Sequence, residues 1–404
     1  MSSMNDGDSD ARFERVDWSE IDRSRRLLTA ERSVFLGGVL AVAALYLYDW
    51  YVAHVYLVGS WNAERIDWVF MLATVVLIAY GVVPLLQRRE SVRRVLGRLR
   101  SRPITVGALG YLLVFVVVGF VGPALVSNPG LRFQHAFHPP VGFTSEIVRV
   151  ECVGRVTGPP FERQCHGSWT YPLGTNERGH PMEFLLVQGT RTALYVTAIT
   201  AAFVVPLATA VGVVAGLRGG LLDGLLMSYV DVQLSIPAIV AYFVGYAYWN
   251  PSLLLLVAAF GFLSWGGIAR LVRSEVLQRR ENGHVRVARS LGASNRYIAR
   301  RHIVPNITNT LVPAVCQLLA LLILFEAGVA FLGFHEIEVY SWGSIISESV
   351  NAEVDGQLQN RAEYPAYQLW WVSTLPALAL TATMLSFKLV GDGLRDALDP
   401  RGER

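Results

Sequence analysis

Long apolar runs alternate with short polar segments along most of the chain. A membrane-spanning helix needs about 20 mostly apolar residues. Runs of that kind predict spanning helices near residues 34–58, 68–86, 104–126, 190–217, 222–248, 252–272, 311–333 and 369–389. The pattern therefore predicts an all-α integral membrane protein with about eight transmembrane helices.

The composition agrees with a membrane protein. Of 404 residues, 52% are hydrophobic and only 17% are charged, which is too apolar for a soluble chain of this length. The first 33 residues mix six arginines with eight acidic residues and hold no short apolar core. We therefore expect residues 1–33 to be a polar tail and no cleavable signal peptide to be present.

The placement of arginine predicts the orientation, because positive residues are retained on the cytoplasmic side of a membrane. With the N-terminus inside, 27 of the 35 Lys and Arg residues fall in segments that face the cytoplasm. Both termini are therefore expected on that side. The basic run 87–103 is interpreted as a membrane anchor, because it lacks the aromatic residues that stack on nucleic-acid bases.

The segment 286–302 is rich in arginine and separates two apolar runs. Val287, Ala288 and Leu291 form an apolar stripe on one short helix. One interpretation is an amphipathic segment that lies on lipid headgroups. The stripe is only about one turn deep, however, and it is surrounded by small residues. Such a surface is better suited to insertion into a groove on another protein.

The same segment contains the signals for a turn between two helices. Gly292 is expected to end the first helix, because glycine adopts a positive φ at little cost. Ser294 is placed to cap a second helix, and Pro305 is expected to mark its end. The pattern predicts a short helix–turn–helix on the cytoplasmic surface.

Residues 127–189 form a long, proline-rich loop that is too polar to span a membrane. Cys152 and Cys165 lie in this loop, on the side expected to be oxidising. A disulfide between them would contribute about 2–4 kcal/mol, and two free thiols are the alternative. Cys316 lies in an apolar run and is expected to be a small core residue.

The sequence carries no recognisable motif for catalysis or for nucleotide or metal binding. A G-x-x-x-x-G-K-[ST] phosphate loop is excluded, because the one lysine, Lys388, stands in the context FKLV. The motifs H-E-x-x-H and G-x-S-x-G and paired C-x-x-C are also absent. We expect no enzymatic activity, no catalytic or metal site, and no cofactor bound by this chain.

Two carboxylates fall inside predicted spans. A charge at the middle of a membrane costs about 2.5–3.5 kcal/mol on insertion scales, so Asp231 and Glu326 should face protein or a water-filled path. Asp231 can alternatively bond backbone groups freed by Pro237, and Glu326 can pair with another helix. Both residues are candidates for contact with a transported solute, and both have this structural alternative.

The segment around residues 286–306 resembles the EAA loop of permease subunits of binding-protein-dependent ABC transporters, in the branch that imports dipeptides and oligopeptides. Its residues are RVARSLGASNRYIARRHIVPN. Further motifs of that family follow in order: YPLGTNERGH at 171–180, LRGGLLDGLLMSYVDVQLSIP at 217–237, LSWGGIARLVRSEV at 263–276, FEAGVAFLGF at 325–334, SWGSIISES at 341–349 and LVGDGLRDALDPR at 389–401. The resemblance covers the chain from about residue 92 onward.

The resemblance implies a type I ABC importer permease core at residues 91–404, with an external loop at 127–189 and a cytoplasmic coupling loop at 273–308. In that family the coupling loop docks into a groove of a cytoplasmic ATPase and transmits nucleotide-driven closure to the membrane helices. The implied ATPase-coupling residues are Arg286, Val287, Ala288, Leu291, Gly292, Ala293, Ser294, Arg300, His302 and Pro305.

The chain departs from the family pattern in two places. Arg286 and Val287 stand where the family has Glu and Ala, which puts any ion pair made by that Glu in doubt. Residues 34–90 add a transmembrane hairpin and the start of a basic loop ahead of the usual core, and the sequence suggests no role for them.

The expected function is that of a plasma-membrane permease subunit of an ATP-driven importer for dipeptides, oligopeptides or similar small solutes. The resemblance implies as partners a second permease, two ATPase subunits that carry ATP and Mg, and an external solute-binding protein, besides membrane lipid. The alternative is a self-contained secondary carrier or channel that uses Asp231 and Glu326 as proton or ion sites. The lack of a recognisable inverted repeat counts against that alternative.

Overall fold

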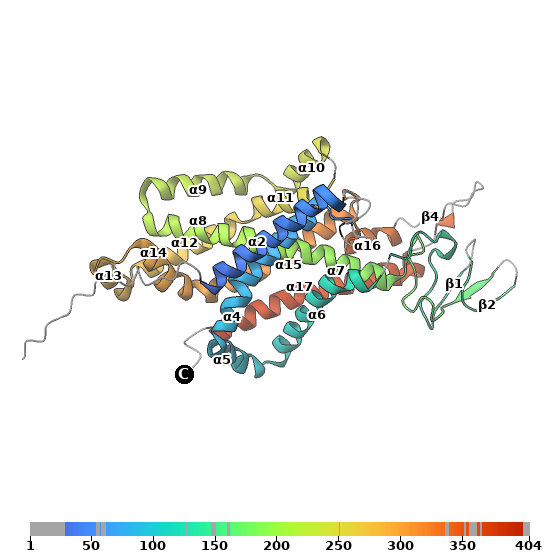
Figure 1. The fold of residues 1–404 in the computed structure, drawn as a ribbon. Helices are drawn as coiled ribbons and strands as arrows, with labels where there is room; N and C mark the ends of the chain where they lie inside the picture. The colour runs from blue at the N-terminus through green and yellow to red at the C-terminus, as the bar shows by residue number, and fades with distance from the viewer. Residues whose placement is uncertain are drawn as a thin grey trace, which may run out of the picture.

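A bundle of long apolar helices forms most of the chain in a computed structural model (Figure 1). The structure describes residues 29–53, 57, 62–126, 128–146, 151–159, 162–249, 251–335, 339–350, 353–354, 362–363 and 366–398. Among these residues, seven helices are long and apolar enough to cross a membrane, or eight if one bent helix pair counts as a span. The predicted all-α membrane fold is confirmed.

The spanning segments follow the predicted apolar runs, and several contain a π-helical or 3-10 turn, labelled η. They consist of α2 (Ala30–Tyr48) with η1 (Asp49–Ala53); α3 (Arg65–Leu77), η2 (Ile78–Val82) and α4 (Val83–Gln87); α6 (Pro103–Leu125); α7 (Met182–Ile199), η4 (Thr200–Val204) and α8 (Val205–Arg218); α11 (Leu253–Ser264) and α12 (Gly266–Arg280); α14 (Asn295–Ile298), η5 (Ala299–Ile303) and α15 (Val304–Phe331); and η6 (Ala366–Leu369) with α17 (Trp370–Leu398). The other helical elements are α5 (Arg89–Arg100), η3 (Phe133–His135), α9 (Gly220–Ser235), α10 (Ala238–Tyr248), α13 (Gly283–Ser290) and α16 (Trp342–Val350).

The predicted span at 222–248 is not one straight helix. α9 ends at Ser235 and α10 begins at Ala238, and the two helices are bent by 72°. Pro237 lacks an N–H group and keeps the preceding Ile236 extended, with ψ 115°. The structure therefore corrects the prediction to a broken span at this position.

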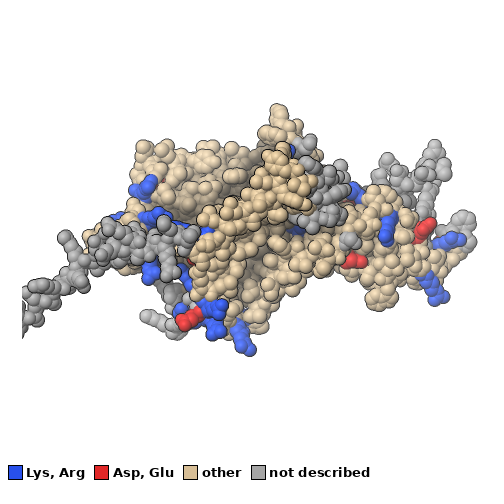
Figure 2. Space-filling view, in the orientation of Figure 1, with Lys and Arg blue, Asp and Glu red and all other residues tan. Residues whose placement is uncertain are grey.

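The two ends of the bundle differ in structure (Figure 1). One end, the coupling end, carries α5, α13 and α14. The other, the loop end, carries α16 and the described residues 128–146, 151–159 and 162–181 of the loop. Figure 2 shows Lys and Arg at both ends of the bundle, on either side of a mostly uncharged middle. Which of the two ends faces the cytoplasm stays a prediction.

The helices α8 and α12 approach closely because two glycines face two valines. A Cβ atom added at Gly212 would lie 2.7 Å from Cβ of Val272, and one at Gly216 would lie 2.7 Å from Cβ of Val276. Such short separations leave room only for hydrogen at these positions. At the coupling end, Arg280 Nη1 also donates to the Gly216 carbonyl oxygen at 3.0 Å. α12 is therefore held firmly against α8.

The extra N-terminal hairpin packs on the core through a buried polar cluster. Arg191 Nη2 on α7 donates to Asp67 Oδ1 on α3 at 2.9 Å, and the Tyr195 hydroxyl donates to the same carboxylate oxygen. Asp67 is only 3% exposed. Beside this cluster the rings of Phe70 and Tyr195 stack with centroids 4.1 Å apart. The hairpin is thus attached to the rest of the bundle by charge pairing as well as by apolar contact.

A small antiparallel sheet organises the loop end. Its strands β1 (Thr144–Glu146), β2 (Val156–Thr157) and β3 (Gln164–His166) lie in the order β1-β3-β2. A second, two-stranded sheet pairs β4 (Glu353–Val354) with β5 (Ala362–Glu363). The loop is shorter than the predicted 127–189, because α7 already begins at Met182 after Pro181.

Candidate functional site

The short helices α13 and α14 and the four residues between them form a sharp turn, which we call the coupling elbow. At its centre the N–H of Ala293 donates to the Ala288 carbonyl, and the N–H of Gly292 donates to the Arg289 carbonyl, each at 3.0 Å. These two bonds form a Schellman motif, in which the residue after the helix adopts a left-handed conformation. Gly292 has φ +85°. The predicted helix stop at Gly292 is confirmed.

The second helix of the elbow begins as predicted but does not end as predicted. The Ser294 side chain accepts a hydrogen bond from the Tyr297 N–H at 3.2 Å, which caps α14. α14 then continues through η5 into the long helix α15, in which Pro305 is the second residue. In η5 the Val304 N–H bonds to the Ala299 carbonyl. Because this π-helical turn already shifts the hydrogen bonds directly ahead of Pro305, the helix continues through the proline and the predicted stop is wrong.

The elbow presents two large apolar side chains to solvent. Val287 is 57% exposed on α13, and Leu291, the C-cap residue of that helix one turn later, is 60% exposed. Ala288, between them in sequence, is half-buried. The predicted apolar stripe therefore exists and is open to a partner rather than covered by the chain itself.

The opposite side of the elbow is anchored in the protein. Val285 on α13, Ile298 on α14 and Ile303 in η5 are fully buried and belong to the main hydrophobic core. α13 follows α12 after a two-residue turn, and α12 is bonded to α8 and α9. The elbow is therefore continuous with α12 and α15 and packed on the core, and it is not a free surface loop.

The other predicted coupling residues surround the elbow. Arg286 and Arg300 are exposed, whereas Ala293 and His302 are half-buried. The His302 ring lies 5.7 Å from the His284 ring and 5.8 Å from the Tyr297 ring, measured between centroids. The structure therefore brings the predicted coupling residues together at one end of the bundle, with His302 facing the inner side of the turn.

The two intramembrane carboxylates occupy different surroundings. Asp231 on α9 forms an exposed ion pair with Arg270 on α12. Glu326 on α15 is 4% exposed and lines a small cavity together with Tyr242, His335 and Ser341. The structure does not bring the two carboxylates into a common site, which a carrier that relays protons or ions between them would need.

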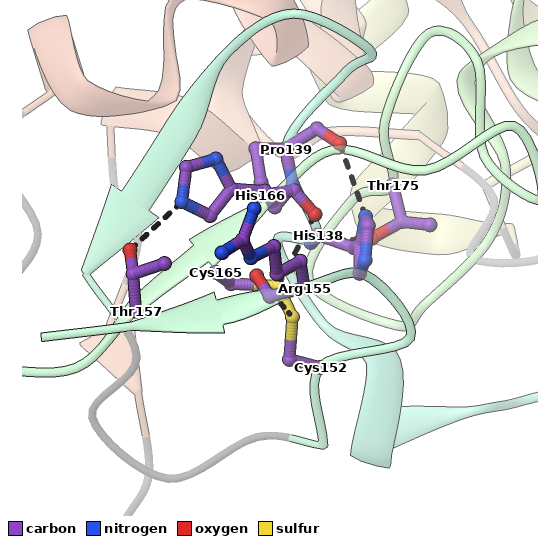
Figure 3. Close-up of a disulfide and its surroundings, with 8 residues drawn as sticks. All are labelled: His138, Pro139, Cys152, Arg155, Thr157, Cys165, His166 and Thr175. Atoms are coloured by element: carbon purple, nitrogen blue, oxygen red, sulfur yellow. Dashed lines mark hydrogen bonds between the residues drawn. A yellow bond between two sulfur atoms is a disulfide. The ribbon is translucent and has the colours of Figure 1, made fainter.

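The predicted disulfide between Cys152 and Cys165 is present, with Cα atoms 5.7 Å apart (Figure 3). It ties the turn before β2 to the central strand β3. A ring nitrogen of His138 lies within 4.8 Å of both sulfur atoms. This group resembles a metal-ligand set in geometry only, because sulfur atoms joined in a disulfide are not thiolate ligands.

The sequence analysis missed a buried polar junction at the loop end. Asn176 is fully buried, and its side-chain oxygen accepts the N–H groups of Arg178 and His180 at 3.1 and 2.8 Å. Its side-chain amide donates to the Glu348 carboxylate on α16 at 2.9 Å. Burial raises the pKa of Glu348 to about 7, opposed by the Asn176 hydrogen bond and reinforced by the nearby Glu177 charge. In the sequence, the one sign of this junction is that Asn176 is followed by a turn that contains Gly179.

This junction predicts a pH-dependent stability. A carboxyl group whose pKa is raised on folding binds its proton more tightly in the folded state. Its contribution is therefore fully present below its ordinary pKa, near 4.5, and is lost as the pH rises through about 7. We expect the free energy of unfolding to fall by about 1.4 kcal/mol between pH 6 and pH 8 through this group.

The Glu348→Gln variant, which keeps the shape and removes the titration, should lack this fall when unfolding is measured at both pH values. An equal decline in the variant and the wild type would show that another group is responsible.

Comparison with known proteins places these features in a family. A family model described as a binding-protein-dependent transport system inner membrane component matches residues 208–404. The dipeptide transport system permease protein DppC of Bacillus subtilis is 28% identical over 308 residues, which cover 76% of this chain and 85% of that protein. The oligopeptide transport system permease protein OppC of Haemophilus influenzae is 31% identical over 230 residues, which cover 57% of this chain and 70% of that protein.

Among solved structures, a chain of the MetNI methionine ABC transporter matches with a TM-score of 0.43 and 20% identity, over 55% of this chain and 99% of that chain. The family is established by the sequence matches alone, because this chain is more than 30% identical to OppC over a region that covers more than two thirds of OppC. The chain belongs to the binding-protein-dependent transport system inner membrane components and is a multi-pass permease of the plasma membrane.

Proposed function

We propose that this chain is one of two permease subunits of an ATP-driven importer for dipeptides, oligopeptides or similar small solutes. An external solute-binding protein delivers the solute at the loop end. Two ATPase subunits, which carry ATP and Mg, bind the coupling end. The names of the relatives support the solute class, since they are dipeptide and oligopeptide transport permeases.

The proposed coupling role rests on the structure of the elbow. It combines an exposed apolar pair, Val287 and Leu291, with a buried anchor in the helices α12 and α15. An apolar side chain that inserts into a groove gains about 1.5–3 kcal/mol from full burial, and a rigid anchor carries the displacement of the groove into the bundle. The elbow has both properties, and Arg286 stands on its exposed side, where it would meet the groove of the ATPase.

The proposal predicts which energy source drives uptake. The test uses proteoliposomes that contain this chain, the second permease, the ATPase subunits and the solute-binding protein. We expect them to accumulate a labelled dipeptide only when ATP is present on the side of the membrane where the ATPase subunits lie. A proton ionophore should not reduce the initial rate. In contrast, this chain alone under an imposed proton gradient should transport nothing, and accumulation in that control would support a secondary carrier instead.

A further inference from the structure

The disulfide at the loop end lies beside a buried histidine. His138 is 2% exposed, and its Nε2 atom is buried without a hydrogen-bond partner among the described residues. A ring nitrogen of His138 and the sulfur atoms of Cys152 and Cys165 all lie within 4.8 Å of one another (Figure 3). A buried nitrogen without a partner is costly, so this group gains when a ligand reaches the atom.

The other ring nitrogen sets the state of the imidazole. Nδ1 of His138 lies 3.0 Å from the Pro139 carbonyl oxygen, which can only accept a hydrogen bond. In a neutral ring Nδ1 therefore carries the proton, and Nε2 has a lone pair. Histidines that bind metals in proteins almost always donate their other N–H to a carbonyl, a carboxylate or water, and this bond fixes the tautomer and the ring orientation. His138 already has the hydrogen bond that orients a ligand histidine.

The backbone of His138 is held by the core of the protein. Its N–H donates to the Thr175 hydroxyl at 2.8 Å, and its carbonyl oxygen accepts the Thr175 N–H at 3.0 Å. The Thr175 carbonyl in turn accepts a hydrogen bond from Trp371 Nε1 on α17 at 3.1 Å. Thr175 and Trp371 are both fully buried. These bonds fix His138 independently of the disulfide, so its position does not depend on whether the two sulfur atoms are joined.

Reduction of the disulfide turns both sulfur atoms into possible ligands. A small dithiol supplies two electrons and two protons, the S–S bond breaks, and the dithiol leaves as its own cyclic disulfide. Zinc(II) then displaces the two thiol protons, which pass to the buffer. Two thiolates, one neutral imidazole and one zinc ion have a net charge of zero. Neutrality suits this place, because Cys165 and His138 are each only 2% exposed.

The spacing of the three groups is compatible with zinc. Bonds of about 2.3 Å to sulfur and about 2.0–2.1 Å to nitrogen place tetrahedral ligand atoms about 3.5–3.8 Å apart. Atoms already within 4.8 Å of one another reach that spacing by rotation of the cysteine side chains. Cys152 is half-buried, which gives the ion an entrance from solvent. Three protein ligands leave the fourth position of the ion to water.

We propose that the reduced loop end binds one zinc ion through His138, Cys152 and Cys165, and that the ion replaces the disulfide as the link between the turn before β2 and strand β3. The disulfide excludes the metal, and reduction admits it. Either link closes the same separation of 13 positions, a spacing that matches no zinc-binding motif. The site is independent of the solute that the permease transports.

Zinc binding by the purified full-length chain tests the proposal. A Cys316→Ser background removes the free cysteine. The chain is reduced with dithiothreitol, separated from the reductant without oxygen, and titrated with zinc alone. We expect the reduced chain to bind one zinc ion at least about 100-fold more tightly than the unreduced chain, which has neither thiolate. Cobalt(II) in place of zinc should give the thiolate-to-metal absorption that shows direct bonding to sulfur.

Two histidine variants distinguish a ligand from a neighbour. His166 is next to Cys165 on β3, but its Nε2 already bonds the Thr157 hydroxyl at 2.8 Å (Figure 3). His166→Ala should therefore bind zinc as the wild type does. His138→Ala should bind at least about 100-fold more weakly, because loss of a group that merely orients a ligand already costs about 10–100-fold. Detection of the disulfide in unreduced His138→Ala by mass spectrometry shows that its loop still folds.

Two further measurements on the reduced wild type do not depend on any variant. Zinc should slow the alkylation of Cys152 and Cys165, and it should slow proteolysis between them. No zinc bound by the reduced chain, or alkylation that zinc leaves unchanged, would overturn the site. Equal zinc affinity in His138→Ala and His166→Ala would overturn His138 as a ligand. Zinc that binds and protects the thiols without slower proteolysis would overturn the ion as the link that replaces the disulfide.

Discussion

Leu291→Ala and Gly292→Val should each abolish ATP-dependent dipeptide uptake while the chain stays inserted in the membrane at wild-type abundance. Leu291 is the larger exposed apolar side chain of the elbow, and truncation of an interface anchor costs about 2 kcal/mol or more. That cost corresponds to about 30-fold weaker binding of the ATPase subunits. Uptake of a labelled dipeptide and co-purification of the ATPase subunits measure the two consequences.

Gly292→Val acts through the backbone rather than through a lost contact. A Cβ atom at this position would meet nothing within 4 Å, so the substitution creates no clash. The φ of +85° is the obstacle, because a β-branched residue adopts it only at a strain of about 1–3 kcal/mol. We expect the turn to relax that strain by a change in the direction of α14 relative to α13, which would move Leu291 out of the proposed ATPase groove.

Two further variants separate docking from general damage. Leu96→Ala truncates another exposed leucine at the coupling end, on α5, and it should transport normally. Arg286→Glu restores the charge that the family usually carries and should be milder than either elbow variant. If Leu291→Ala and Gly292→Val both transport normally with the ATPases bound, the elbow is only a charged surface helix and the secondary-carrier interpretation gains weight.

Asp67→Ala should destabilise the protein by about 3–5 kcal/mol, because it leaves the Arg191 guanidinium without its charge partner in a largely buried position. It also removes the acceptor of the Tyr195 hydroxyl. The expected consequence is separation of the N-terminal hairpin from α7 before the core unfolds. Thermal unfolding in detergent, followed by proteolysis of the hairpin, measures the loss.

The matched control for Asp67 is an exposed ion pair in the same protein. Arg102 and Asp396 form a pair in which the side chains are 51% and 49% exposed. Exposed pairs contribute about 0–1 kcal/mol, so Arg102→Ala should be nearly neutral in the same measurement. Similar losses for Asp67→Ala and Arg102→Ala would show that the hairpin is held by apolar packing and that the buried cluster adds little.

Most of the membrane fold could be predicted because a span is encoded locally. About 20 apolar residues are sufficient to identify a helix, and the runs at 104–126 and 68–86 differ from the observed helices by only a few residues. The elbow was equally local, since Gly292 and Ser294 act on their own backbone and on that of the next few residues. The disulfide could be anticipated as one of two alternatives, because only two cysteines share the loop.

The errors have a common physical origin in proline. Pro237 and Pro305 both follow a β-branched residue, but Pro237 breaks a span whereas the helix continues through Pro305. The difference depends on the residues before each proline and on the π-helical turn η5, which shifts the hydrogen bonds ahead of Pro305. Such a turn has no clear sequence signal, so the outcome at Pro305 required the structure.

The long-range polar contacts could not be predicted at all. Asp67 and Arg191 lie 124 positions apart, and Asn176 and Glu348 lie 172 apart. Each residue looked like an ordinary polar position at the end of a helix or in a loop. Only the packing of α3 on α7, and of the loop on α16, gives these side chains their partners.

The binding of purified ATPase subunits to the detergent-solubilised permease tests the central claim most directly, because it measures docking at the elbow without transport. The Kd should be about 30-fold higher for Leu291→Ala than for the wild type and unchanged for Leu96→Ala. An equal Kd for all three proteins would contradict the account, because the ATPases would then bind elsewhere on the chain.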